Sequence, residues 1–549
     1  MRGTGVISAG TARPGADHPV TSSRRLLDWL ALLVPAAAAL VVGGYHLGQL
    51  SLWRDEAYSL EAADRSIPQI FALLHHTDAV NGTYYLFMHG VIGLLGTSAT
   101  ALRVPSLIAT AVAAAMTAAL GRLLSRWAGL PAPWLAGLLA GLLYVATPQV
   151  TRYAQDARAY AIVTMFVTIA TYLLVRAMMA GTWRWWAGYA LAIVAGGVFN
   201  LFSLLVVVAH AVTVLLTYLA RRPAAAPDSV AAPDSVAAPA PVRLRRWLVA
   251  AVAAGIVLSP LAYLGNKQRG QISWLTRPGL ATIRALLDGF AGSRTLVYPI
   301  AVLALCGLAA GITAKSRRAA VPGSLTPAMV AGPWLVLPPV IMIAVSRFKP
   351  IYDIRYVLFC QPAVALLCGV GLVWLAHVIA QAPVIAQAGA RARNLAWLPS
   401  AGLVVLVLVL LIAPQRAVRQ PSSRPDNLRY NAAVIAAHAR PTDIVFYIPW
   451  NQRVLGMGYP GPFRQLRDIA LAESPVKSDT LLGTEVSLAT LRHRLHNVSR
   501  VWLITSASKH TLATERDPVE RAELKLIHGM RLIGRWHADD DWLSLYTVR

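Results

Sequence analysis

Two short segments of the chain place carboxylates beside residues that can assist proton transfer. The segment SLWRDEAYSL carries the adjacent acids Asp55 and Glu56, and TRYAQDARAYA carries Asp156, Arg158 and Tyr160. Each segment borders long apolar stretches, so each is expected at a membrane surface. Because acidic residues contribute little to the orientation of membrane helices, acids at these places indicate a site. The alternative is that the first two acids only cap a surface helix or pair with nearby arginines.

A third segment, SRFKPIYDIRY, brings the cations Arg347, Lys349 and Arg355 to the same predicted surface. Outward-facing cations beside a helix end run against the usual cytoplasmic excess of Lys and Arg, which indicates a bound anion. Arg and Lys are the usual partners of phosphate. The alternative is that these side chains snorkel or are attracted to anionic lipid headgroups.

Carboxylates and cations gathered at a membrane surface suit one reaction in particular. A carboxylate can take the proton from an acceptor hydroxyl as that hydroxyl attacks the anomeric carbon of a sugar carried by a lipid phosphate. Cations can stabilise the charge that develops on the departing phosphate. Such a transfer requires no nucleotide.

The elements that must position these residues are membrane helices. Of the 549 residues, 56% are hydrophobic and 14% charged, and the apolar residues fall in long blocks, as in membrane proteins. One crossing needs about 20 apolar residues. The formal charge of +25 lies mostly in short connections between the blocks, where topology signals belong, so the bilayer and not nucleic acid is the expected partner. The pattern predicts about eleven spans, at 27–50, 100–122, 132–149, 159–179, 187–200, 201–220, 247–264, 297–314, 328–346, 356–378 and 397–414.

The apolar stretch 83–95 is short for a span, so we predict a helix lying on the outer surface. With that stretch left out of the count, most basic connections share one side with the N-terminus, which the positive-inside rule makes cytoplasmic. Residues 1–26 are then a cytoplasmic tail. The chain is expected to be a multi-pass protein of the cell membrane whose acid-bearing loops face outward.

Three parts of the chain follow from this pattern. Residues 27–414 form the transmembrane module, interrupted at 221–246 by an Ala/Pro-rich segment that repeats AAPDSV and is predicted to be a disordered cytoplasmic loop. Residues 415–549 alternate short apolar runs, such as 444–448, with polar helical stretches, which predicts a small α/β domain. An odd number of spans places this domain outside.

The outer segments resemble the GT-C class of integral membrane glycosyltransferases, in particular the family 39 group around protein O-mannosyltransferases and the lipid A aminoarabinose transferase. That family carries a DE or D motif after its first span, matched here by WRDEAY at 53–58. Its His-rich segment, which leads into Tyr-Tyr and a surface helix, is matched by HHTDAVNGTYYLFMH, although Gly82 and Thr83 replace the family's two prolines. LRVPS, YAQDARAYA and IRYVLFCQPAVALL resemble later family elements, with Cys360 and Gln361 intruding in the last.

The resemblance implies an all-α polytopic GT-C fold and an inverting transfer from a polyprenyl-phosphate sugar. It makes Asp55 the catalytic base, with Glu56 or Asp156 supporting the acceptor or a metal ion. Arg158 and Arg355 become contacts of the donor phosphate, as does Arg347.

Further substrate-binding candidates come with the same resemblance. They are Lys349 beside the predicted phosphate contacts, Tyr160 of the second outer loop, and His75, His76, Tyr84 and Tyr85 of the first.

The resemblance also bears on the ligands. Mannose is the leading donor sugar, with arabinose and other pentoses open, and the acceptor can be a lipid, a glycan or a protein. No cofactor is required, and a divalent metal ion is left open. The main rival function is a transporter or flippase for lipid-linked glycans, which predicts ionisable or Gly/Pro-broken positions near mid-membrane. The acids of this chain cluster instead at loop positions.

Overall fold

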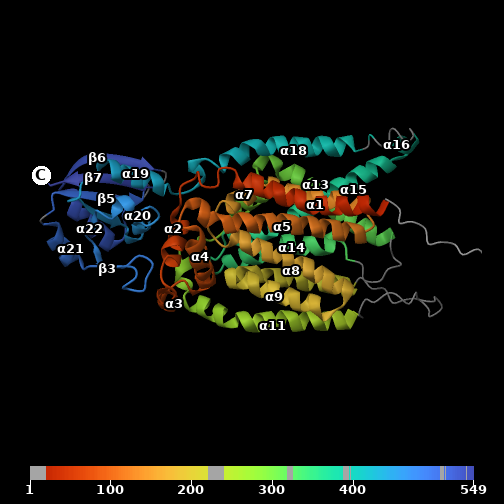
Figure 1. Ribbon diagram of the computed structural model, residues 1–549, viewed down its shortest axis with the longest axis horizontal. Coiled ribbons are helices and arrows are strands. Elements are labelled where there is room, and N and C mark those ends of the chain that lie inside the picture. The colour runs from red at the N-terminus through yellow and green to blue at the C-terminus, as the bar shows by residue number, and fades with distance from the viewer. Residues whose placement is uncertain are drawn as a thin grey trace, which may run out of the picture.

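The computed structural model describes residues 20–219, 240–317, 325–387, 395, 397–496, 498–506, 512, 515–538 and 541–548. A bundle of long helices runs along one axis, and a smaller domain built on a β-sheet covers one end of it (Figure 1). The predicted all-α polytopic membrane architecture with a small α/β domain is confirmed.

The bundle is made of apolar helices. Among the described residues, nine helices are long and apolar enough to cross a membrane, and a bent pair raises the number to 10. The predicted span 187–200 corresponds to a helix of 17 residues, at the lower limit for a crossing. The helices that match the predicted spans are α1 (Val20–Gly44), α5 (Ala99–Trp127), α6 (Pro133–Ala146), α8 (Tyr160–Ala180), α9 (Trp183–Phe199), α10 (Leu205–Leu219), α11 (Ala240–Lys267), α13 (Val297–Arg317), α14 (Pro327–Ser346), α15 (Gln361–Gln381) and α18 (Leu398–Ala417).

Two predicted boundaries have a clear backbone cause. The span predicted at 132–149 is broken between α6 and α7 (Pro148–Ala154), whose axes differ by 67°. Pro148 disfavours a helical conformation of the residue before it, and Thr147 is indeed extended, with φ −70° and ψ 123°. Asn200, also extended, separates α9 from α10, as predicted, and its side chain accepts from the amide of Phe202 at 2.9 Å.

Two predicted connections are shorter than expected. The helix α11 begins at Ala240, so residues 240–246 of the loop predicted at 221–246 are helical, and 220–239 lie outside the described residues. Likewise α1 begins at Val20, inside the tail predicted at 1–26. Hydropathy marks only the part of a helix that suits lipid, whereas Ala, Leu and Arg continue the helix beyond it.

Short helices connect the bundle to the sheet domain. They are α2 (Arg54–Ala63), α3 (Ile67–His76) and α4 (Gly82–Leu95), with η1 (Ala79–Asn81) between the last two, and they gather at the end of the bundle nearest the sheet (Figure 1). The helix α4, which packs on α2 and α5, is the stretch predicted as a surface helix. Other short pieces at or between the long helices are η2 (Leu201–Leu204), η3 (Arg269–Ile272), α12 (Leu280–Ala291), η4 (Arg294–Leu296), η5 (Ile354–Cys360), α16 (Pro383–Gln387) and η6 (Pro421–Ser423).

The C-terminal domain contains a mixed sheet with strand order β2-β1-β5-β7-β6. β1 pairs in parallel with β2 and β5, whereas β7 is antiparallel to β5 and β6. Phe446, Ile448, Val501 and Leu503 build its core. The strands are β1 (Ile444–Ile448), β2 (Arg467–Asp468), β5 (Arg500–Ser506), β6 (Arg531–Ala538) and β7 (Asp541–Thr547), with β3 (Leu471–Glu473) and β4 (Thr484–Glu485) in a separate pair. The helical pieces are α19 (Leu428–His438), η7 (Trp450–Gly456), α20 (Pro460–Phe463), α21 (Leu488–Leu495) and α22 (Pro518–His528).

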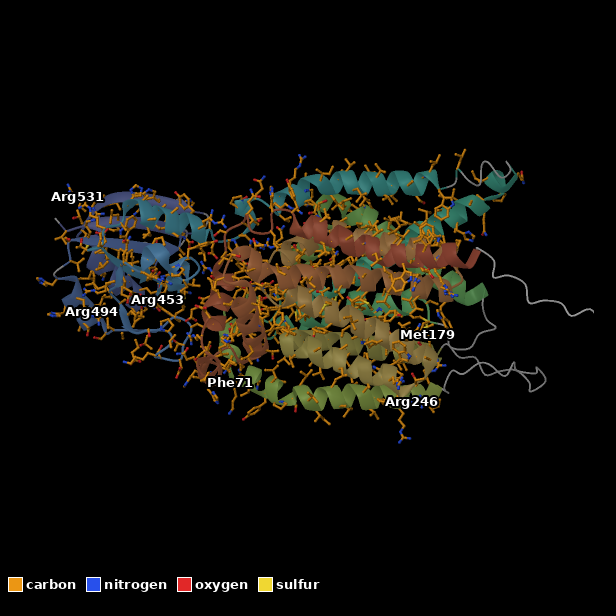
Figure 2. All side chains as sticks on the ribbon, viewed as in Figure 1. Phe71, Met179, Arg246, Arg453, Arg494 and Arg531 are labelled. Atoms are coloured by element: carbon orange, nitrogen blue, oxygen red, sulfur yellow. The ribbon has the colours of Figure 1, made fainter. Side chains whose placement is uncertain are left out.

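The two ends of the bundle differ. Arg246 lies at the end opposite to the C-terminal domain, which carries Arg453, Arg494 and Arg531 (Figure 2). The connection predicted to be cytoplasmic and the domain predicted to be outside are therefore at opposite ends. Which end faces the cytoplasm stays a prediction.

Candidate active site

Asp55 and Arg355 form an ion pair at the junction between the bundle and the C-terminal domain. Asp55 lies in the first turn of α2, and Arg355 lies in η5, directly before α15. Nη1 of Arg355 donates to Oδ2 of Asp55 at 2.5 Å, with 11% and 20% of the two side chains exposed. Two segments separated by 300 residues in the chain thus meet through opposite charges.

The guanidinium of Arg355 is also held by acids and rings. Its Nε lies 3.3 Å from Oδ2 of Asp353. Its centre lies 5.3–5.9 Å from the centroids of four aromatic rings, those of Trp53, Tyr160, Trp274 and Tyr356. These rings attract the cation through their π faces and keep it in place. Tyr160, predicted to bind substrate, therefore lies next to the Asp55–Arg355 pair.

Arg158 approaches the same residue from the second outer loop. Its Nη1 donates to the hydroxyl of Ser59 at 3.0 Å and lies 3.4 Å from the carbonyl oxygen of Asp55. Since α7 ends at Ala154 and α8 begins at Tyr160, the short loop between them presents this side chain to α2. Two cations from separate segments therefore flank Asp55.

Glu56 has a different environment from that of its neighbour. Its carboxylate is fully buried and accepts from Nε and Nη2 of Arg103, each at 2.7 Å, and from the amide of Ala157 at 2.8 Å. Burial opposes ionisation, but the guanidinium beside it holds the pKa of Glu56 below its ordinary value. A carboxylate enclosed in this way cannot reach an acceptor, so the catalytic role expected for Glu56 does not fit the geometry.

Asp156 is also buried. Its Oδ1 accepts from the indole Nε1 of Trp53 at 2.8 Å, and its Oδ2 has no hydrogen-bond partner among the described residues. Burial raises the pKa of this carboxyl, against the attraction of Arg424. Its contact orients Trp53, one of the rings around Arg355, so the direct contact with substrate that the sequence suggested for Asp156 is replaced by a positioning contact.

The tyrosines of the first outer loop are structural in this arrangement. Tyr84 and Tyr85 are buried where α4 packs on α2, and the hydroxyl of Tyr85 donates to the carboxylate of Asp78. His75 and His76 are exposed on α3, and Nδ1 of His75 donates to the carbonyl of Phe71 at 2.7 Å. The two tyrosines therefore lie beneath the site, within reach of the charge of Arg158, whereas no contact joins His75 or His76 to Asp55 among the described residues.

Only one of the three predicted cations of the later segment meets the site. Arg347 and Lys349 are exposed, and Nη1 of Arg347 donates to the carbonyl of Pro278 at 2.9 Å. Among the described residues no group of three or more His, Cys, Asp or Glu side chains is placed to hold a metal ion. We therefore assign no metal ligand.

Contacts from the C-terminal part were missed by the sequence analysis. Asp426 accepts from the backbone amide, Nε and Nη2 of Arg54 at 2.7–3.0 Å, and Nη2 of Arg54 lies 3.8 Å from Asp541. Nη2 of Arg424 donates to the carbonyls of Arg152 and Gln155, both at 2.9 Å. The segment after α18 is therefore bound to both acid-bearing loops.

This arrangement of side chains suits the abstraction of a proton by a carboxylate beside a bound anion. Of the three predicted acids, Asp55 is partly exposed, whereas Glu56 and Asp156 are enclosed. Its partner Arg355 and the nearby Arg158 can stabilise the negative charge of a bound anion.

Solved structures show the fold to which this site belongs. No family model and no curated protein matches the chain. The apo crystal structure of ArnT from Cupriavidus metallidurans aligns over 96% of this chain and 98% of its own, with TM-score 0.55 and 14% identity. Its complex with undecaprenyl phosphate covers 94% and 98%, with TM-score 0.50 and 15% identity. The apo oligosaccharyltransferase of Archaeoglobus fulgidus covers 92% and 73%, with TM-score 0.50 and 11% identity.

At these identities the likeness is one of fold. The chain has the GT-C fold of multi-pass membrane proteins, with helices long enough to cross a bilayer and a sheet domain at one end. The aligned region spans nearly the whole of both ArnT and this chain, so the bundle and the C-terminal domain are both included.

Proposed function

We propose that the chain is a membrane glycosyltransferase that transfers a sugar from a polyprenyl phosphate to an acceptor hydroxyl. The observation that carries this proposal is the ion pair between Asp55 and Arg355, with Arg158 at the carbonyl of Asp55. It combines a partly exposed carboxylate with two cations at the surface end of a membrane bundle. The crystal structure of ArnT with bound undecaprenyl phosphate shows that this fold can hold a polyprenyl phosphate in another protein.

Each group has a defined part in the transfer. The acceptor oxygen attacks the anomeric carbon from the side opposite the phosphate, the bond from that carbon to the phosphate oxygen breaks, and Asp55 takes the hydroxyl proton. The departing phosphate gains negative charge, which Arg355 and Arg158 neutralise. Attack opposite the leaving group inverts the configuration of the anomeric carbon.

The Asp55–Arg355 pair connects donor binding to the base. A donor phosphate that contacts Arg355 competes with Asp55 for its donors, because a guanidinium can bind phosphate with two parallel hydrogen bonds. Loss of the short contact frees Asp55 for the acceptor hydroxyl. Donor binding and activation of the base are thereby linked.

The finer assignments rest on the motif resemblance. Mannose is the proposed donor sugar, family 39 the proposed family, and the outer face of a cell membrane the proposed side of transfer. The acceptor is a hydroxyl of a lipid, glycan or protein.

The test is transfer from radiolabelled polyprenyl-phosphate mannose by purified protein in membranes. Asp55→Asn should lower transfer by about a hundredfold or more, while Asp64→Asn, an exposed acid directly after the same helix, should have no effect. Full activity of Asp55→Asn would refute the base. Transfer from a pentose donor alone would correct the sugar, and no transfer from either donor with several acceptor extracts would favour a transporter.

A further inference from the structure

A cavity of about 400 Å³ lies where the segment after α18 meets the connection between α1 and α2. Asp55 and Arg355 do not line this cavity, so it is separate from the candidate active site. Four charged residues line its wall: Arg419, Arg424, Asp426 and Arg429. We call it the arginine cavity.

The wall of the arginine cavity carries an excess of positive charge. Among the described residues, Arg419, Arg424 and Arg429 form no ion pair within 4.0 Å, and the guanidinium of each donates to backbone carbonyls. The acid that shares the wall, Asp426, is neutralised by Arg54 at 2.7 Å. Asp156 and Glu56 already act on the charge of Arg424, so Arg419 and Arg429 supply most of the charge that a ligand in the cavity would meet.

Arg424 adds a buried positive charge to the wall of the cavity. It is 4% exposed, and its Nε and Nη1 have no hydrogen-bond partner in the described part of the chain. Burial lowers the pKa of its guanidinium, even though the nearby Asp156 attracts the charge. These two nitrogens are buried, so Arg424 acts on the cavity through its charge, and an anion in the cavity would add a counter-charge to it.

A groove on α18 is bordered by the same linker, residues 418–427, that borders the arginine cavity. Val409, Ile412 and Ala413 line its apolar part, and Arg416 and Gln420 line the part after them in the chain. The linker residues alternate, since Gln420 and Ser422 line the groove while Arg419 and Pro421 line the cavity. An apolar groove that leads to cations suits a lipid with acidic headgroup, whose chains can lie along the helix.

We propose that the arginine cavity binds a phosphate group, supplied by the headgroup of an anionic lipid or by a free phosphate ion. Phosphate oxygens match the fork of an arginine with two parallel hydrogen bonds. The volume is within the range of small-molecule sites, about 300–1,000 Å³, and accepts a phosphorylated headgroup. This phosphate is additional to that of the sugar donor.

The experiment uses the purified full-length protein in phosphatidylcholine nanodiscs. The unfolding midpoint is followed while inorganic phosphate is added, and separately while phosphatidylglycerol replaces part of the phosphatidylcholine, because a ligand that binds the folded state raises the midpoint. The double variant Arg419→Gln/Arg429→Gln should need about tenfold more ligand or more for the same rise. Arg424→Lys, which keeps the charge and loses the fork, should also bind more weakly.

Two controls separate this proposal from others. Arg464→Gln removes an exposed arginine of the C-terminal domain and should bind like wild type, which excludes a general charge effect. The difference between the double variant and the protein without it should persist when both carry Asp55→Asn, so the proposal can hold even if sugar transfer fails. A rise with phosphatidylglycerol alone assigns a lipid, and a rise with inorganic phosphate supports a free ion. No rise with either ligand, or equal rises in the double variant and wild type, would overturn the proposal.

Discussion

Nη1 of Arg355 lies 2.5 Å from Oδ2 of Asp55, and the two residues approach from η5 and α2. Neither group is completely enclosed, since 11% and 20% of the side chains remain exposed. The neighbouring acid Glu56 points away and is fully buried. The two adjacent carboxylates therefore differ in role: Asp55 faces the partly exposed Arg355, and Glu56 is bound to Arg103 inside the protein.

Replacement of Arg355 should impair donor use. Arg355→Gln removes a charged contact to the donor phosphate worth roughly 2 kcal/mol, so kcat/KM for the polyprenyl-phosphate donor should fall about 30-fold. Arg347→Gln, an exposed cation of the same segment, should change it by less than about twofold. Steady-state kinetics over a range of donor concentrations measures both, and equal effects of the two variants would contradict the assignment.

Removal of Glu56 should destabilise the protein rather than act on the reaction directly. Glu56→Gln leaves Arg103 buried without a counter-charge, and breaking a buried pair costs about 3–5 kcal/mol. Thermal unfolding in detergent should show a marked drop in the midpoint, in contrast to Asp55→Asn. In a double-mutant cycle, adding Arg103→Gln should cost much less than the sum of the single changes; simple additivity would argue against the pair.

Arg54 is expected to hold the C-terminal domain on the bundle. Arg54→Gln removes the guanidinium contacts with both oxygens of Asp426, so hydrogen exchange should accelerate in the first turn of α2 and in residues 418–427. Asp426→Asn should give the same pattern, and combining both should add little. Exchange rates that stay at wild-type values would show that other contacts suffice for docking.

The stability of the C-terminal domain should fall as pH rises through about 7. Burial, with Glu485 and Glu520 nearby, raises the pKa of Glu523 from 4.5 to about 7. Below 4.5 the carboxyl is protonated in both states, and above 7 the folded state must hold a charge that the unfolded state holds at no cost. Glu523→Gln should therefore slow hydrogen exchange of β1 and β5 amides at pH 8 relative to wild type, and not at pH 4.5. Lys525→Gln, an exposed control, should leave both unchanged.

Much of the membrane architecture could be predicted because hydropathy records it directly. The helices that match the predicted spans, the helix at 83–95 and the strand at 444–448 follow from apolar length and period. The break at Pro148 was also visible in the sequence and went unused, since a proline disfavours a helical residue before it.

The site could be predicted only in part. The two acid-bearing loops and Arg355 were identified, because charges beside membrane helices are informative. The sequence analysis did not predict which of the two adjacent acids is paired inside the protein, because the partner of Glu56 is Arg103, which lies in another helix. A cation within an apolar segment is a signal that could have indicated such a partner. Arg424 and Asp426 act on loops far away in the sequence, and no local pattern marks such contacts.

Because Arg54 and Asp55 share a peptide bond, the sheet domain is anchored one residue away from the proposed base. A displacement large enough to separate Arg54 from Asp426 must therefore move the backbone of Asp55 as well. This restricts where the C-terminal domain can be replaced by a domain from another protein. A junction after residue 431 keeps Arg424 and Asp426, whereas a junction directly after α18 loses both.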